Sequence, residues 1–118
     1  MIQMRKVYFL KTCDTCKRIL NEVNTDSFEL QEIKSNPLNA RQLAEMYALS
    51  SSYEELFNKR AKLYKALDLK NKTISETDYK QYILEEYTFL KRPVFIVDNE
   101  IFIGNSKKVV AALKVKLS

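Results

Sequence analysis

The sequence has no histidine and no tryptophan, and it has only one glycine and two prolines in 118 residues. Without an imidazole, neither a histidine-activated nucleophile nor a histidine-ligated metal site can be built. Its two cysteines alone cannot close a tetrahedral zinc site. So few glycines and prolines leave little room for a turn-rich all-β fold, and long helices with few connections are favoured.

Long apolar runs are also missing. No stretch of about 18 uninterrupted apolar residues occurs, so no membrane span is expected. Residues 1–6 lack the apolar region and the cleavage site of a secretory signal, which makes the cytoplasm the expected location. Cysteines in that compartment stay mostly reduced and available for chemistry.

The charge balance is modestly basic. The 20 Lys and Arg against 15 Asp and Glu give a net charge of +5. This excess is typical of a solvated helical surface, and it would also attract anions or acidic partners. No basic cluster is interleaved with exposed-looking aromatics, so direct nucleic-acid binding is not expected.

Hydrophobic patterning predicts the order of elements along the chain. The first part has a strand over 7–10, a helix over 14–24 and a second strand over 27–33. The middle part has helical patterns over 39–49, over 53–69 with a weak point near Asn58, and from Thr73–Asp78 to about 86. The last part has strands over 93–97 and 101–103, joined by Asp98-Asn99, and a helix capped by Ser106.

This order is β-α-β, a helical block, then β-β-α. We therefore predict one α/β domain over residues 1–118, with a mixed four-stranded sheet and a helical insertion at about 37–90. Asn39 is the predicted cap of the first inserted helix. The segment Thr73–Asp78 holds two overlapping capping signals, Thr73 with Glu76 and Ser75 with Asp78.

The sequence Cys13-Asp14-Thr15-Cys16 lies between the first strand and the first helix. Free backbone N–H groups and the helix dipole stabilise an anion at that position, so the pKa of Cys13 should fall below its usual value near 8.5. Two residues three positions apart are within reach of a disulfide, so Cys13 can attack and Cys16 can resolve the mixed species. The alternative is a pair of small buried apolar residues.

Two further basic segments stand out in the sequence. Lys91-Arg92-Pro93 begins the third strand, and a cis bond before Pro93 would aim Arg92 at the thiol, where it would lower the thiol pKa and hold an oxyanion. The alternative is a strand-edge proline beside two surface cations. Asn58-Lys59-Arg60, by its periodicity alone, is a solvated helical stretch.

Three motifs together resemble the arsenate-reductase-like family, which includes the Spx proteins and has a thioredoxin-like fold with a helical insertion. The loop from Leu10 to Arg18 is similar to its active-site loop, Phe57–Arg60 to its middle arginine motif, and Leu90–Val94 to its arginine–cis-proline motif. The resemblance covers essentially all 118 residues. It implies a bacterial, cytoplasmic protein with no tightly bound cofactor.

The resemblance also implies roles for individual residues. Cys13 matches the nucleophile, Arg60 and Arg92 match oxyanion-binding arginines, and Pro93 matches the cis-proline. Lys11 and Thr12 belong to the loop expected to meet the substrate. Where true reductases usually place a third arginine, this chain has Lys107.

Two functions remain open. The first is a thiol oxidoreductase that acts on an oxyanion or a mixed disulfide, works as a monomer and takes electrons from glutathione, glutaredoxin or thioredoxin. The second is an Spx-like redox switch, in which a Cys13–Cys16 disulfide alters binding to the RNA polymerase α subunit. An inactive scaffold that keeps only the fold is a third, weaker alternative.

Overall fold

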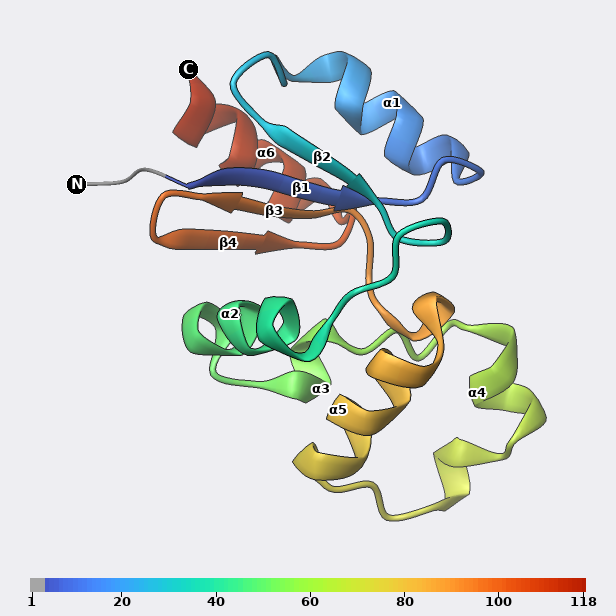
Figure 1. Ribbon diagram of the computed structural model, residues 1–118. Helices are drawn as coiled ribbons and strands as arrows, with labels where there is room; N and C mark the ends of the chain where they lie inside the picture. Colours follow the sequence, from blue (N-terminus) through green and yellow to red (C-terminus); the bar gives the residue numbers. More distant parts are fainter. Residues whose placement is uncertain (1–3) are drawn as a thin grey trace. The chain divides into compact units, whose positions relative to one another are not determined.

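The computed structural model describes residues 4–118 (Figure 1). Residues 1–3, which begin the segment where no secretory signal is expected, lie outside the described residues. The chain divides into two compact units. The first contains residues 4–36 and Arg92–Ser118, and the second is Pro37–Lys91.

The first unit is built on a four-stranded mixed sheet in the order β2-β1-β3-β4. Its strands are β1 (Arg5–Phe9), β2 (Glu29–Glu32), β3 (Val94–Val97) and β4 (Glu100–Ile103). Strand β1 pairs in parallel with β2 and antiparallel with β3, and β3 pairs antiparallel with β4. This confirms the predicted α/β class and the β-α-β/β-β-α order of a thioredoxin-like core.

Two helices complete this unit, α1 (Asp14–Glu22) and α6 (Lys107–Leu117), and Figure 1 shows both on one face of the sheet. The core between them and the sheet is apolar, and the rings of Phe28 and Phe95 meet edge to face in it with centroids 5.6 Å apart. Burying a side chain of this size contributes roughly 1.5–3 kcal/mol. The core residues are Val7, Ile19, Phe28, Phe95, Val97, Phe102 and Leu113. Because this core includes residues from both helices, it fixes where α1 begins relative to β1.

The second unit is helical. Its elements are α2 (Ala40–Ser50), α3 (Tyr53–Leu56), α4 (Lys62–Ala66), the 3-10 turn η1 (Leu69–Asn71), α5 (Glu76–Glu85) and the 3-10 turn η2 (Tyr87–Phe89). Asn39 caps α2 through a capping box with Gln42, as expected. Of the two candidate caps before α5, Ser75 is used, in a capping box with Asp78.

The helical pattern predicted over 53–69 is broken near Asn58, at its predicted weak point, and forms α3 and α4. The chain leaves the helical path at Phe57, which forms an isolated bridge with Leu90 and stacks on Phe89 at 4.9 Å. The backbone N–H of Asn58 then donates to the Phe89 carbonyl oxygen (2.7 Å). The Asn58-Lys59-Arg60 segment is therefore a turn and not a helical stretch, because tertiary contacts of Phe57 override its local helical period.

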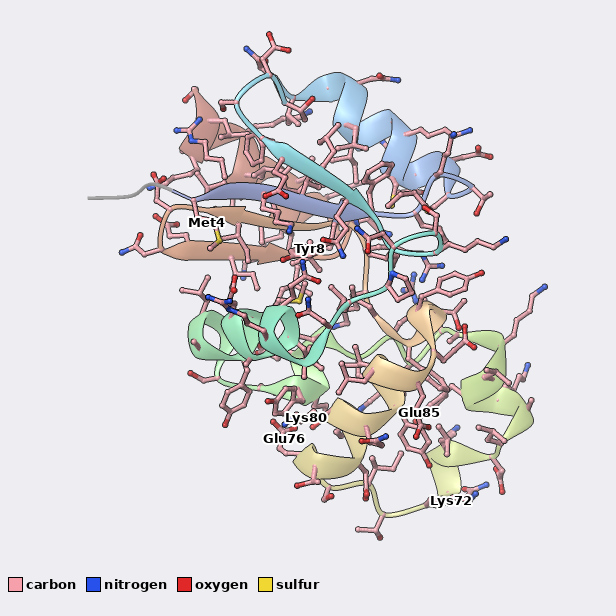
Figure 2. All side chains as sticks on the ribbon, viewed as in Figure 1. Met4, Tyr8, Lys72, Glu76, Lys80 and Glu85 are labelled. Carbon is pink, nitrogen blue, oxygen red and sulfur yellow. The ribbon has the colours of Figure 1, made fainter. Side chains whose placement is uncertain are left out.

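Glu76 has a different role from the expected one. Its carboxylate accepts hydrogen bonds from the backbone N–H groups of Tyr53 (2.7 Å) and Glu54 (3.1 Å), and so satisfies the free N-terminus of α3. Figure 2 shows Glu76 at the start of α5, on the side toward α3.

Within the described residues, three non-glycine residues adopt a left-handed backbone, Ser51 (φ 60°), Asp68 (φ 55°) and Asp98 (φ 59°). Ser51 ends α2, and Asp98 lies in the tight turn that joins β3 to β4. Within residues 4–118, no helix combines the length and the apolar character that crossing a bilayer would need.

Candidate active site

The two cysteines lie where β1 passes into α1. The chain turns between Leu10 and Cys13, and the Cys13 N–H donates to the Leu10 carbonyl oxygen (3.1 Å). Cys13 is the N-cap residue of α1 with an extended backbone, and Cys16 follows in the first turn of the helix. Both cysteines are free thiols; Cys13 is half-buried and Cys16 is buried.

The surroundings of Cys13 favour its thiolate. Partial burial acts to raise the pKa of the Cys13 thiol, but it is outweighed by hydrogen bonds from the Cys16 backbone N–H and the Cys16 thiol. The positive charge of Arg92 and the backbone N–H of Thr15 lower it further. The net pKa of Cys13 is lowered, in the direction that its place at the start of a helix predicts.

The surroundings of Cys16 favour its protonated form. Burial raises the pKa of the Cys16 thiol, and the charge on Cys13 and the hydrogen bond that Cys16 donates to it raise it further. A backbone hydrogen bond from Leu10 and the charge of Arg92 oppose the change. The pKa of Cys16 is raised to about 12, so Cys16 is a neutral donor to the Cys13 sulfur at neutral pH.

Arg92 lies two residues before β3, the strand that pairs with β1. The Arg92–Pro93 peptide bond is cis, as the resemblance implied. The Arg92 carbonyl oxygen accepts a hydrogen bond from the Asn105 side chain (3.3 Å), and the Pro93 carbonyl oxygen accepts one from the Gly104 N–H (2.9 Å). Gly104 has φ 87°, a conformation that glycine adopts without a steric penalty.

Glu32 is part of the site, although no pattern in the sequence singles it out. Its carboxylate accepts a hydrogen bond from the backbone N–H of Lys11 (3.0 Å), and it also accepts from the N–H and the hydroxyl of Ser35 (both 2.8 Å). The Lys11 N–H is the largest cause that lowers the pKa of Glu32. The parallel pairing of Phe9 with Glu32 brings the ends of β1 and β2 together.

The other residues predicted for the site are exposed, and one of them belongs to the second unit. The side chains of Lys11 and Thr12 are exposed in the turn before Cys13, and Lys107 is exposed at the start of α6. Arg60 belongs to the second unit, where it is exposed and its N–H donates to the Asn58 side chain (3.0 Å). Its role in anion binding stays a prediction.

Among the described residues, no group of three or more Cys, Asp or Glu side chains is arranged to hold a metal ion. The site thus consists of two thiols, one guanidinium group, a helix N-terminus and a carboxylate that holds the loop. Such a set can stabilise a thiolate and an anion beside it, and it can form a disulfide within one turn of helix.

A cysteine pair at the first β-α junction, with a cis-proline at the start of a neighbouring antiparallel strand, defines a thioredoxin-like α/β protein. The match to a protein-family model identifies the family within that class. A model of the ArsC family matches residues 8–113, and this chain belongs to the ArsC family.

Other proteins are similar to this chain in sequence or in fold. An uncharacterized protein from Haemophilus influenzae is 29% identical over 109 residues, covering 89% of this chain and 94% of its own. An arsenate reductase from Vibrio cholerae has a similar structure, with a TM-score of 0.73 and 15% identity over 98% of this chain and 99% of its own. A possible arsenate reductase from Streptococcus mutans UA159 gives a TM-score of 0.73 and 23% identity, covering 96% and 99%. These structural likenesses support the fold.

Proposed function

We propose that the protein is a thiol oxidoreductase in which Cys13 is the nucleophile and Cys16 resolves the covalent intermediate. The observation that carries this proposal is the opposite tuning of two adjacent sulfurs: the pKa of Cys13 is lowered, while Cys16 stays protonated and hydrogen-bonded to it. A thiolate is the reactive form of cysteine, and a neutral thiol beside it does not react until it is deprotonated in a second step.

The chemistry balances with either of two substrate classes. With a mixed disulfide, the Cys13 thiolate forms a new S–S bond to one sulfur and the other sulfur leaves as a thiolate. With arsenate, the Cys13 thiolate displaces one oxygen, which leaves as water after protonation. The charge of Arg92 acts on the nucleophile, and Arg92 is the group expected to bind a negatively charged substrate. Arg60, Lys11 and Thr12 are proposed as further substrate contacts.

The second step uses Cys16. Formation of a bond at Cys13 removes the negative charge that helps to raise the pKa of Cys16, so the resolving thiol becomes easier to deprotonate. Its thiolate attacks the Cys13 sulfur and gives a Cys13–Cys16 disulfide. The leaving group is the substrate thiolate or, from arsenate, arsenite, which keeps the electron pair of the broken S–As bond.

Two electrons must then come from outside the protein. Glutathione, glutaredoxin or thioredoxin would reduce the disulfide and return both thiols. We place this cycle in the cytoplasm, where such reductants keep thiols reduced, and in a monomer without a bound cofactor.

The test is turnover of arsenate and of a glutathione–cysteine mixed disulfide, each with glutathione plus glutaredoxin or with thioredoxin as the reductant. Cys13→Ser should abolish turnover. Cys16→Ser should accumulate a Cys13 mixed disulfide, visible by mass spectrometry, and lose thioredoxin-coupled turnover. Absence of turnover of both substrates by the unaltered protein, or activity that survives in Cys13→Ser, would refute the proposal. Full activity in Cys16→Ser would instead assign resolution to the external thiol.

An Spx-like redox switch is the alternative use of the same cysteine pair. It predicts no turnover and capture of the RNA polymerase α subunit by only one redox state of the protein. The Cys13→Ser variant, which cannot form the internal disulfide, would then behave as the reduced state under oxidant.

A further inference from the structure

The Glu32 carboxylate joins two loops at the end of the sheet. One oxygen accepts the Lys11 N–H at 3.0 Å, and the other accepts the Ser35 N–H and hydroxyl, both at 2.8 Å. Lys11 lies in the turn that carries Cys13, whereas Ser35 follows β2. A carboxylate bound by several N–H and O–H donors is held in one orientation.

The Lys11 N–H belongs to the same peptide group as the Leu10 carbonyl oxygen. That oxygen accepts the hydrogen bond from the Cys13 N–H at 3.1 Å. The plane of this peptide is therefore fixed from both sides, by Glu32 at its N–H and by Cys13 at its oxygen. Because the peptide group is planar, a rotation that frees one of these bonds also breaks the other.

The Leu10 backbone also hydrogen-bonds to the Cys16 sulfur. Leu10 is only 6% exposed, so its buried side chain also restrains the position of this backbone. The backbone around Leu10 thus contacts both cysteines, and Glu32 restrains this backbone from the neighbouring strand.

We propose that Glu32 is a positioning residue for the Cys13 thiolate, acting through the Leu10–Lys11 peptide that it holds. This inference rests on the proposed function of Cys13 and deepens it. Geometry, and not charge, is the way in which Glu32 acts: a negative carboxylate near a thiolate opposes ionisation, so its benefit must come from orienting the turn toward the helix N-terminus and Arg92.

Three substitutions of Glu32 separate the effect of side-chain length from the effect of charge. Glu32→Gln keeps the length of the side chain and an acceptor oxygen for the Lys11 N–H, but loses the charge. Glu32→Asp keeps the charge but is one methylene too short. Glu32→Ala loses both. Ser35→Ala is the matched control, because it removes one bond to the same carboxylate without touching Lys11.

The experiment measures the pKa of Cys13 in the reduced full chain, from the pH dependence of iodoacetamide alkylation followed at Cys13 by mass spectrometry. We expect Glu32→Asp and Glu32→Ala to raise it and to slow alkylation at neutral pH by about three- to tenfold, as a rise of half to one unit would do. Glu32→Gln and Ser35→Ala should stay near the unaltered protein.

Two patterns of Cys13 pKa values would overturn the proposal. A lowered Cys13 pKa in both Glu32→Gln and Glu32→Ala, with Glu32→Asp unchanged, would show that Glu32 acts through charge. A lowered unfolding midpoint with an unchanged Cys13 pKa in all variants would show a structural role only. Alkylation is independent of substrate, so a reactive Cys13 that turns over no substrate would refute the proposed function and leave the role of Glu32 intact.

Discussion

The Cys16 thiol donates a hydrogen bond to the Cys13 sulfur, and this contact moves the pKa values of the two sulfurs in opposite directions. The bond favours the charged form of Cys13, the acceptor, and the neutral form of Cys16, the donor. The two cysteines of the chain are therefore chemically different before any substrate arrives.

The hydrogen bond itself can be tested by substitution of its donor. Cys16→Ala removes the donor and should raise the pKa of Cys13, whereas Cys16→Ser keeps a hydroxyl donor and should leave it near its original value. The measurement is the pH dependence of Cys13 alkylation in the reduced protein. Equal Cys13 pKa values in the two variants would show that this bond contributes nothing.

Arg92 is expected to support the Cys13 thiolate by its charge. Arg92→Ala should raise the pKa of Cys13 and slow its alkylation at neutral pH by about three- to tenfold, while Arg92→Lys should restore part of the rate. Arg18→Ala is the control, because Arg18 is exposed on α1 and is not among the main causes that shift the pKa of Cys13. A similar loss of rate in Arg18→Ala would mean that net charge alone is responsible.

The raised pKa of Cys16 predicts how stability depends on pH. The pKa of an unfolded thiol is about 8.5, whereas the pKa of Cys16 in the folded protein is raised to about 12. Between these values the folded state binds more protons than the unfolded state, so stability falls as pH rises, by at most ~1.4 kcal/mol per pH unit. The lowered pKa of Cys13 has the opposite sign: its contribution is lost as pH falls through the folded value.

Urea unfolding of the reduced protein and of Cys16→Ser, compared at about pH 9 and about pH 10, measures this effect. The serine variant has no ionising thiol at this position, so its free energy of unfolding should fall less over the same interval. An equal fall in the free energy of unfolding of both proteins would contradict the raised pKa of Cys16.

The caps of α5 give a prediction about stability alone. Ser75→Ala should lower the free energy of unfolding by about 1 kcal/mol, because the Ser75 hydroxyl accepts the Asp78 N–H at the helix N-terminus. Thr73→Ala should change it little, since Thr73 is exposed and lies outside the capping box. Chemical unfolding of both variants tests the pair, and the reverse order of effects would contradict this assignment.

The sequence predicts most of the first unit because its signals are local. The apolar run at Val7 and the alternation after Ser27 match β1 and β2, and the helix expected over 14–24 is α1, which ends two residues earlier at Glu22. Pro93 and Gly104 likewise bracket the hairpin of β3 and β4. The cysteine pair could be placed at the start of a helix by the same reasoning.

Other features depend on contacts that local patterns do not contain. Phe57 ends α3 because it packs against Phe89, thirty-two positions later in the chain. The helical spacing of apolar residues contains no information about such a distant contact. Glu32 joins the site only because the strand register sets it beside Phe9, and a single charged residue at a strand end gives no such signal.

The left-handed backbone at Ser51, Asp68 and Asp98 has a practical consequence. This conformation costs a residue with a Cβ about 1 kcal/mol, whereas glycine adopts it freely. The one glycine of the chain is at position 104. These three positions are therefore where a more heat-resistant variant of the protein should first be sought.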